Sequence, residues 1–339
     1  MGEGAGSVLV TGGTGFIGGY VTRELVDRGR AVTVLSRGRT TTPDMRYALR
    51  DHAGGFATET GTVEDLPTLL ATFELVKPAT VVHAASNVEV AKLFRDPYLA
   101  FQTNVTGTLN VLEAARRTGV RRVVDISSIG VLPAIQYEPI DAAHPIMLAR
   151  EGPGSGAYGA AKASGELFAF AFQRAYGLDV RIVRPSAVYG FGMQQHSANY
   201  MKEFVEPAVR GEQVKLPSGG RLPRDYTHVE DVASLTVRVV DCDEDADRIF
   251  YAATGGPLVT AAQAARLVAE LIPGSSIEVA DAMTADDEIE ASFRGVISIE
   301  NARAQLGWAP RFAVLREGVQ EYIATYRAFL AERPRRVAS

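Results

Sequence analysis

Residues 8–29, "VLVTGGTGFIGGYVTRELVDRG", place three glycines between a short apolar run and a stretch of helical periodicity. A strand that leads through a glycine-rich turn into a helix is the arrangement that holds the phosphates of a dinucleotide. Gly12 would permit the tight turn, Gly15 would let a pyrophosphate approach the backbone, and Gly18 would let the helix pack closely on the sheet. The free N–H groups at the helix N-terminus would face the phosphates. The stretch therefore predicts a dinucleotide site, and the residues after Gly18 exclude a P-loop.

The same alternation of strand and helix continues through the first half of the chain. The predicted strands are 8–11, 31–35, 80–83, 122–126 and 180–183, and the predicted helices are 16–28, 64–75, 98–118 and 157–176. Because the strands barely alternate with polar residues, we expect them to be buried on both faces of a parallel sheet. The predicted fold class is α/β, a Rossmann-type doubly wound parallel sheet with a smaller mixed α/β substrate domain.

The domain boundaries follow from a change of pattern at residue 185. Glycine, proline and glutamine interrupt the alternation there, and a strand-like run at 248–252 and helix-like stretches at 261–271 and 315–329 follow. The stretch 229–241 again has an apolar face and is expected to return to the first domain. The predicted dinucleotide domain comprises residues 1–184 and about 226–254. The predicted substrate domain comprises residues 185–225 and 255–332.

Composition limits the classes of function. The 339 residues carry a formal net charge of −5, so a broad cationic surface for nucleic acid or anionic lipid is not expected. No apolar run approaches the length of a membrane span, and the N-terminus lacks the pattern of a secretory signal. The single cysteine, Cys242, cannot form an internal disulfide, and one cysteine with five scattered histidines offers no zinc spacing. These features predict a cytoplasmic protein without a metal site.

Ser36 and Arg37 follow the second predicted strand, where the ribose of a dinucleotide is expected. An acidic residue here would bind the 2′-hydroxyl of NAD and repel the phosphate of NADP. Arginine can instead hold a phosphate with two parallel hydrogen bonds. NADP(H) is therefore favoured, and NAD(H) is the alternative if Arg37 is only a solvated loop residue.

Tyr158 and Lys162 lie four residues apart in "YGAAK", so a helix would place both on one face. A fixed ammonium favours the phenolate of a tyrosine, which could then exchange a proton with an alcohol or a carbonyl near neutral pH. An ordinary contact on a surface helix is the alternative. "VVDISSIG" ends the preceding strand with Ser127 and Ser128, at the edge of the sheet where ligands bind. A helix cap is the alternative for these serines, and the lack of a G-x-S-x-G elbow excludes a hydrolase of that type.

Together these residues resemble the extended short-chain dehydrogenases/reductases, the NAD(P)-dependent epimerase/dehydratase family. The similar segments run in order along nearly the whole chain: "TGGTGFIG", "VVHAAS", "NVTGTLNVLEAA", "ISSIGVLP", "YGAAK", "IVRPSAVYGFG", "RDYTHVEDVA" and "ISIENARAQLGWAPR". The resemblance implies that Tyr158 is the acid/base, that Lys162 tunes it and holds the nicotinamide ribose, and that Ser128 orients the substrate oxygen. Asn104 would order the active-site backbone or a water, and hydride would pass between the substrate carbon and the nicotinamide.

The resemblance also implies which residues bind the cofactor and the substrate. The cofactor-binding residues would be Gly12, Thr14, Gly15, Phe16, Ile17, Gly18, Ser36, Arg37, Thr62, Val63, Ala84, Ala85, Ser86, Ile126, Tyr158, Lys162, Pro185 and Val188. The substrate-binding residues would be Ser128, Ser186, Asn199, Arg224 and Arg294. The two arginines would contact a diphosphate, or would instead form a salt bridge between the domains. Three residues depart from the family pattern: Thr62 replaces an Asp, Leu132 a Tyr and Ser186 an Asn.

Two enzymatic functions follow from the resemblance. The first is an epimerase or a 4-keto reductase of a nucleotide sugar, which "RDYTHVEDVA" and "LGWAP" favour. The second is an NADPH-dependent reductase or dehydrogenase of a non-nucleotide ketone or alcohol, which Ser186 and the loop "MQQHSANYMKEF" favour. A cofactor-sensing regulator would not require the set of Ser128, Tyr158 and Lys162. The apolar faces of helices 98–118 and 157–176 predict a homodimer, because in the family these helices form the dimer interface.

Overall fold

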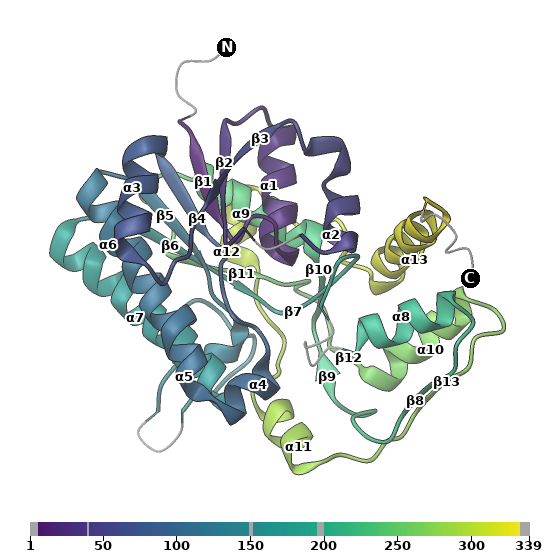
Figure 1. Cartoon of the computed structure of the whole chain (residues 1–339). Helices are drawn as coiled ribbons and strands as arrows, with labels where there is room; N and C mark the ends of the chain where they lie inside the picture. Colours follow the sequence, from purple (N-terminus) through teal and green to yellow (C-terminus); the bar gives the residue numbers. More distant parts are fainter. Residues whose placement is uncertain (1–5, 39–40, 149–151, 195–199, 333–339) are drawn as a thin grey trace.

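A seven-stranded parallel sheet forms the centre of the computed structural model, which describes residues 6–38, 41–148, 152–194 and 200–332 (Figure 1). The strand order is β11-β6-β5-β4-β1-β2-β3. The strands are β1 Val8–Thr11, β2 Val32–Ser36, β3 Phe56–Thr60, β4 Thr80–His83, β5 Arg122–Ile126, β6 Asp179–Pro185 and β11 Ile249–Ala252. The order along the sheet reverses between β1 and β4, which is where open α/β sheets bind ligands. The predicted Rossmann-type doubly wound sheet is confirmed.

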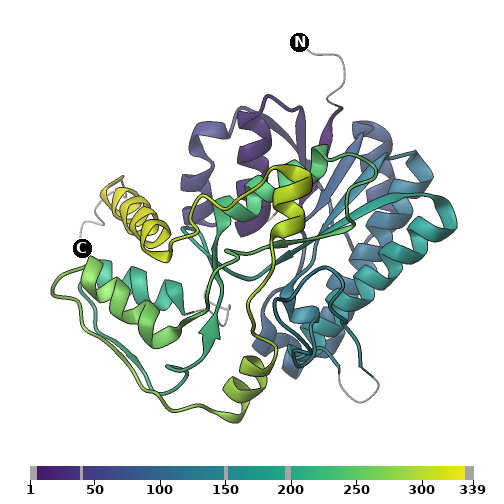
Figure 2. The ribbon, with the colours of Figure 1, turned by 180° about the vertical axis from the view of Figure 1, so that it is seen from behind.

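Helices cover both faces of this sheet, as Figures 1 and 2 show. Val8 and Val10 of β1 pack with α1 (Phe16–Asp27) and α9 (Val229–Asp241) in one apolar cluster. Leu9, between them, packs with α3 (Leu66–Val76) and α6 (Gly107–Thr118) in another. Alternate residues of one strand therefore enter opposite layers, which is why these strands are apolar throughout.

The structure differs from the predicted elements in several places. Strand β3 was not among the predicted strands because it is an edge strand, and all its residues are half-buried or exposed. The predicted helix 98–118 is interrupted: α5 (Pro97–Ala100) is followed by a π-helical turn, Phe101–Thr106, before α6 begins. Three other short helices also carried no clear periodicity: α2 Pro43–Ala48, α4 Val90–Arg95 and α12 Glu300–Leu306.

A second, smaller group of elements lies beside the sheet (Figure 2). Helices α8 (Met201–Val209), α10 (Ala261–Leu271) and α13 (Leu315–Glu332) enclose an apolar core that includes Phe191, Phe204 and Tyr322. Three strand pairs accompany them: β7 Ala187–Tyr189 with β10 Tyr226–His228, β9 Pro223–Arg224 with β12 Val259–Thr260, and β8 Val214–Leu216 with β13 Ile277–Val279. Helix α11 (Ala285–Ser292) lies between this group and the sheet domain. The predicted boundaries between the two domains stay a prediction.

Two absences can be stated for the described ranges. No helix there has both the length and the apolar character needed to cross a membrane. Nor do these residues bring together three or more His, Cys, Asp or Glu side chains in a group that would hold a metal ion.

Candidate active site

In the glycine turn after β1, Gly12 and Gly18 are packed tightly against the protein backbone, whereas there is open space beside the middle glycine, Gly15. Gly12 has a φ of 69°, and a Cβ on it would lie 2.8 Å from the Cα of Ala85. A Cβ on Gly18 would lie 2.3 Å from the carbonyl oxygen of Gly12, so helix α1 rests directly on the turn. At Gly15, the only atom of the described residues that a Cβ would approach is the same oxygen, at 3.2 Å. Gly15 is also the N-cap of α1 and provides no side-chain acceptor, so the first N–H groups of the helix remain available to a phosphate.

Asn104, in the π-helical turn, holds the segment that follows β4. Its Oδ1 accepts hydrogen bonds from the Asn87 backbone N–H at 2.7 Å and from the Ser86 hydroxyl at 3.1 Å. Its Nδ2 donates to the carbonyl of Asn87 at 2.9 Å. Asn104 is buried, and π-helical turns occur often at functional sites. The side chain therefore orders the backbone beside the glycine turn.

The segment that carries Ser127 and Ser128, which we call the serine loop, begins where β5 ends. Ser127 is buried and Ser128 is half-buried, and Ser128 caps the short 3-10 helix Ile129–Val131 by accepting the Gly130 N–H at 2.9 Å. Ser128 therefore does cap a helix, which was the alternative interpretation of this serine. It occupies a lone pair of the hydroxyl oxygen and leaves the O–H free to donate to a ligand.

Helix α7 (Gly156–Tyr176) carries Tyr158 and Lys162, and its first turns lie against this loop. The Lys162 ammonium is buried and donates to the carbonyl oxygen of Ile126, the last residue of β5, at 2.7 Å. A Cβ on Gly159 would lie 2.1 Å from the carbonyl oxygen of Gly130, so the helix backbone touches the serine loop. Tyr158, half-buried, packs against a small apolar cluster that includes Ala161. The structure thus brings all three predicted catalytic side chains of this region to one end of the sheet.

The contact at Gly159 leads to a first prediction. The substitution Gly159→Ala should lower the free energy of unfolding by about 1–3 kcal/mol, because the added methyl group has no space beside Gly130. Gly165→Ala, on the same helix, is the matched control, because its nearest neighbour would be a Thr108 methyl at an ordinary 3.4 Å. The control should be neutral or stabilising by up to about 1 kcal/mol, since alanine favours the helix. Urea unfolding of the two variants measures the difference, and equal stabilities would contradict the contact.

A buried ionic network that was not predicted contacts the serine loop through Ser127. Arg184 donates to both carboxylate oxygens of Glu166, at 3.0 and 2.6 Å, and also to the hydroxyl of Tyr251, at 2.7 Å. The Ser127 hydroxyl donates to the same carboxylate at 2.5 Å. Glu166 lies one helical turn beyond Lys162 on α7, so a spacing of four residues repeated twice was the signal available in the sequence.

His83 connects the strand of the glycine turn with helix α6. Its Nδ1 lies 2.8 Å from the Thr11 hydroxyl oxygen and its Nε2 lies 3.1 Å from that of Thr108. Burial, with a contribution from the charge of Lys162, lowers the pKa of His83 to about 3. Burial raises the pKa of Asp125, its neighbour across the strands, to about 6. His83 is therefore neutral near pH 7 and serves as a hydrogen-bonding link.

The two predicted substrate arginines meet at one carboxylate. Glu290 of α11 accepts from Arg224 Nη1 and from Arg294 Nη2, both at 2.5 Å to the same oxygen. Burial alone would raise the pKa of Glu290, but the two guanidinium groups lower it below its ordinary value. Ser186 donates to the carbonyl of Asp225 at 3.0 Å, which ties the end of β6 to the segment that carries Arg224. Asn199 lies outside the described residues.

A cavity of about 290 Å³ lies beside the glycine turn, at the end where the ribose of a dinucleotide is expected. Thr14 and Ser36 line it, with their hydroxyl oxygens 3.4 Å apart. Arg46 of α2 also lines it and was not predicted, because α2 is short and lies between loops. Arg37 is exposed next to this cavity, and Thr62 and Val63 follow β3.

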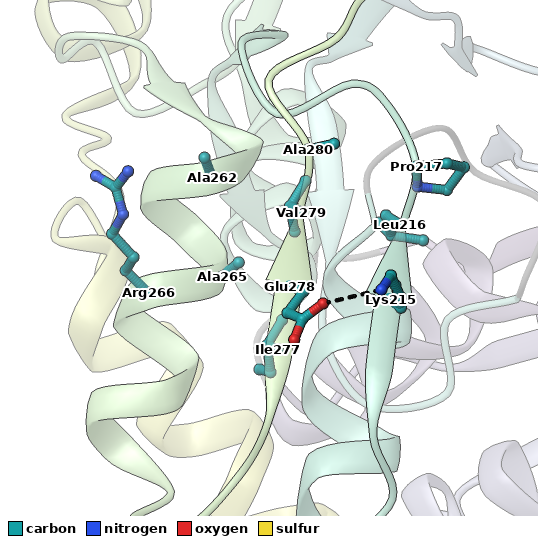
Figure 3. Close-up of a pocket in the computed structure, with 10 residues that line it drawn as sticks. All are labelled: Lys215, Leu216, Pro217, Ala262, Ala265, Arg266, Ile277, Glu278, Val279 and Ala280. Atoms are coloured by element: carbon teal, nitrogen blue, oxygen red, sulfur yellow. Dashed lines mark ion pairs between the residues drawn. The ribbon is translucent and has the colours of Figure 1, made fainter.

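The remaining predicted residues surround the same end of the sheet. Phe16 and Ile17 open α1, Ala84 and Ala85 follow β4, Pro185 ends β6, and Val188 lies in β7. A larger cavity, of about 420 Å³, lies elsewhere, between α10 and the strands β8 and β13 (Figure 3). The ion pair of Lys215 and Glu278, at 3.3 Å, bridges its two strands. None of the predicted site residues lines that cavity.

Comparison with known proteins identifies the family. The model of the NAD dependent epimerase/dehydratase family matches residues 8–252, which is most of the chain. The chain belongs to this family. Over 337 residues, this epimerase/dehydratase-family chain is 30% identical to the UDP-glucose 4-epimerase of Mycolicibacterium smegmatis, a match that covers 94% of this chain and 98% of that one.

Solved structures that resemble this chain include UDP-glucose 4-epimerases. The UDP-glucose 4-epimerase of Thermotoga maritima, crystallised with UDP-glucose, has a TM-score of 0.80 and 26% identity, covering 96% of this chain and 99% of that one. The UDP-glucose 4-epimerase of Thermus thermophilus in complex with NAD has a TM-score of 0.80 and 27% identity, covering 95% and 99%. The predicted resemblance is confirmed: the family member is an NAD-dependent enzyme of the extended short-chain dehydrogenase/reductase type.

Proposed function

We propose that this enzyme transfers a hydride at a secondary alcohol or ketone carbon of a nucleotide sugar, as an epimerase or a 4-keto reductase. The observation that supports the proposal is the placement of Ser128 and Lys162 at the end of β5, with Tyr158 one helical turn before Lys162 on α7 and the open glycine turn on the neighbouring part of the sheet. The buried pair of Arg224 and Arg294 supplies the charge that a diphosphate requires. The relatives named above act on or bind UDP-glucose according to their names.

The side chains divide the work of proton transfer. Tyr158 gives a proton to the reacting oxygen or takes one from it, and the Ser128 O–H donates to the same oxygen. Lys162 uses one of its three N–H groups on the Ile126 carbonyl, which leaves two for the phenol side and the ribose. A bound nicotinamide supplies or accepts the hydride. The residues fit this group, because the turn at Gly12, Gly15 and Gly18 leaves no room for a side chain on Gly12 or Gly18 and is open at Gly15.

A reductase or dehydrogenase of a non-nucleotide ketone or alcohol is the second candidate. The hydroxyl of Ser186 is bonded to the Asp225 carbonyl, and the two arginines already have Glu290 as an anionic partner. These contacts leave less binding capacity for a diphosphate than two unpaired arginines would.

Incubation of the purified protein with reduced or oxidised cofactor and a panel of UDP- and dTDP-sugars separates these functions. An epimerase yields a new nucleotide sugar without net loss of reduced cofactor. A 4-keto reductase consumes NADPH or NADH in proportion to product, as absorbance at the nicotinamide band shows. Consumption with simple ketones, together with inactivity toward every nucleotide sugar, would support the second candidate instead.

We propose further that the cavity beside Ser36 accepts the 2′-phosphate of NADP, although the family and the Thermus thermophilus complex support NAD. Arg46 lines this cavity, and Arg37 lies between two residues that line it, Ser36 and Gly38. Ser36 stands where an acidic residue would repel the phosphate. Arg46→Ala should therefore raise the Kd for NADPH about tenfold, by loss of a charge-assisted hydrogen bond, with little effect on NADH.

Arg50→Ala is the matched control for this cofactor prediction. Arg50 lies on the same segment but stacks on the Tyr47 ring, 3.8 Å from its centroid, and donates to the Tyr47 carbonyl. Fluorescence titration with NADPH and NADH measures both variants without any turnover. An equal loss of NADH and NADPH affinity in Arg46→Ala, or no loss of either, would contradict the phosphate site.

We propose that two copies of the chain associate through α4, α5 and α7. Large apolar side chains are exposed on these neighbouring helices, among them Phe94 at 81%, Tyr98 at 68% and Phe168 at 41% exposure. Burial of such a patch against a second copy would remove this apolar surface from water. Light scattering of the purified protein should report a dimer. Phe168→Asp should shift it toward monomer, whereas Val314→Asp, at an exposed position before α13, should not. A monomeric wild-type protein would overturn this proposal.

A further inference from the structure

Arg224, Arg294 and Glu290 form a compact charged cluster, and the buried Asp225 carboxylate also interacts electrostatically with Arg294. The Arg224 side chain is fully buried, that of Arg294 is 11% exposed, and that of Glu290 is 18% exposed. Both guanidinium groups donate to a single oxygen, Oε1 of Glu290. Arginine keeps its charge at any pH that a protein tolerates, so two buried guanidinium groups require an anion between them.

Further polar atoms line the cluster. Within the described ranges, the hydroxyl of Tyr226 and the Nε of Arg294 are buried and make no hydrogen bond. Both arginines act electrostatically on Tyr226, whose pKa burial nonetheless raises to about 12, so it stays a hydrogen-bond donor. The ring centroid of Tyr200 lies 5.7 Å from the guanidinium carbon of Arg224. These groups could bind an anion with more oxygens than one carboxylate provides.

Glu290 is carried by a short helix with several solvent-exposed side chains. Helix α11 has eight residues, and its C-terminal end is anchored, because the Ser292 carbonyl accepts from the Ile135 N–H at 3.0 Å and the next residue, Phe293, is buried. Its residues Asp286, Glu288 and Ile289 are exposed, and Asp287 is occupied in capping the helix at Thr284. The Glu290 side chain is itself 18% exposed, so its carboxylate can turn from the arginines toward water by rotation of the side chain while the end of α11 stays in place.

We propose that Glu290 is an internal counter-ion, which occupies the two arginines in the unliganded protein and is displaced by the diphosphate of the substrate. The inference rests on the proposed function, in which the substrate carries a diphosphate. Glu290 then competes with the ligand for the same guanidinium groups. It lowers the affinity for diphosphates and favours ligands with enough negative charge to replace a carboxylate. Glu290 is thereby a residue that determines affinity and selectivity without touching the reacting carbon.

Binding of UDP, measured by calorimetry, tests this role. Glu290→Gln should bind UDP about tenfold more tightly than the wild type, because a neutral amide competes less well for the arginines. Uridine, which has no phosphate, should bind all variants equally. Glu288→Gln is the matched control: it removes the same charge from α11, at an exposed position 3.9 Å from Arg221, and should leave the Kd for UDP unchanged.

The outcomes separate this inference from the proposed function. If the wild type binds UDP and a folded Glu290→Gln binds it equally or more weakly, the counter-ion role is wrong and the proposed function stands. If the wild type itself binds no nucleoside diphosphate, the proposed function fails first. Should Glu290→Gln prove unfolded by circular dichroism, Glu290→Asp keeps the charge on a shorter side chain and should bind UDP several-fold more tightly than the wild type. An unchanged Kd in that variant would overturn the inference.

Discussion

Replacement of Tyr158 by phenylalanine is expected to lower kcat by about 10²–10⁴-fold, the range over which a general acid/base contributes. The helix position, the packing against Ala161 and the nearby Lys162 ammonium would all persist, because only a hydroxyl is removed. Cofactor and substrate affinities should therefore change little. Steady-state kinetics, together with fluorescence titration of the cofactor, measure the two quantities separately.

Tyr176→Phe is the control for that substitution. Tyr176 ends the same helix, is 57% exposed and packs edge-to-face against Phe172, with 5.2 Å between ring centroids. Its variant should keep full turnover. If Tyr158→Phe also kept full turnover, the proton would have to move through another group, and the proposed roles of Lys162 and Ser128 would lose their basis.

Replacement of Arg184 by methionine is expected to lower the free energy of unfolding by about 3–5 kcal/mol, because it leaves the buried Glu166 carboxylate without its ionic partner. The double variant Glu166→Leu with Arg184→Met should recover much of this loss, since removal of both charges leaves neither buried and unpaired. Urea unfolding of the wild type and the three variants, including Glu166→Leu alone, completes the cycle.

The surface pair of Arg303 and Glu300 provides the control for the buried pair. Its side chains are 51% and 72% exposed, so Arg303→Met should cost no more than about 1 kcal/mol. Equal effects of Arg184→Met and Arg303→Met would show that the ionic network under the serine loop contributes no more than a solvated pair.

The strands of the sheet could be predicted from the sequence wherever both of their faces are buried. Strands β1, β4 and β5 begin and end at the predicted residues, because parallel strands between two helix layers are continuous apolar runs. Strand β3 lies at the sheet edge and lacks this signal. The π-helical turn that holds Asn104 was also missed, because it preserves the apolar periodicity of a helix and alters only the backbone hydrogen bonds.

In the candidate site as well, some features could be predicted from the sequence and others could not. The spacing of Tyr158 and Lys162, and the place of Ser128 at a strand end, are local features that the sequence shows directly. The partners that fix them are distant: Arg184 meets Glu166 across 18 residues, and Arg224 meets Glu290 across 66. No local periodicity predicts which buried charges will pair, because that depends on how the helices pack on the sheet. Glu290 and Arg46 therefore emerged only from the structure.

We propose that Tyr158 and Ser128 serve hydride transfer at a carbon of a nucleotide sugar. The most direct test mixes the cofactor-loaded protein with UDP-glucose and with the other sugars of the panel, and follows nicotinamide absorbance and sugar products within one turnover. We expect a change of cofactor redox state with at least one nucleotide sugar, and loss of that change in Tyr158→Phe. A redox change with simple ketones but with no nucleotide sugar, or one that survives in Tyr158→Phe, would contradict it.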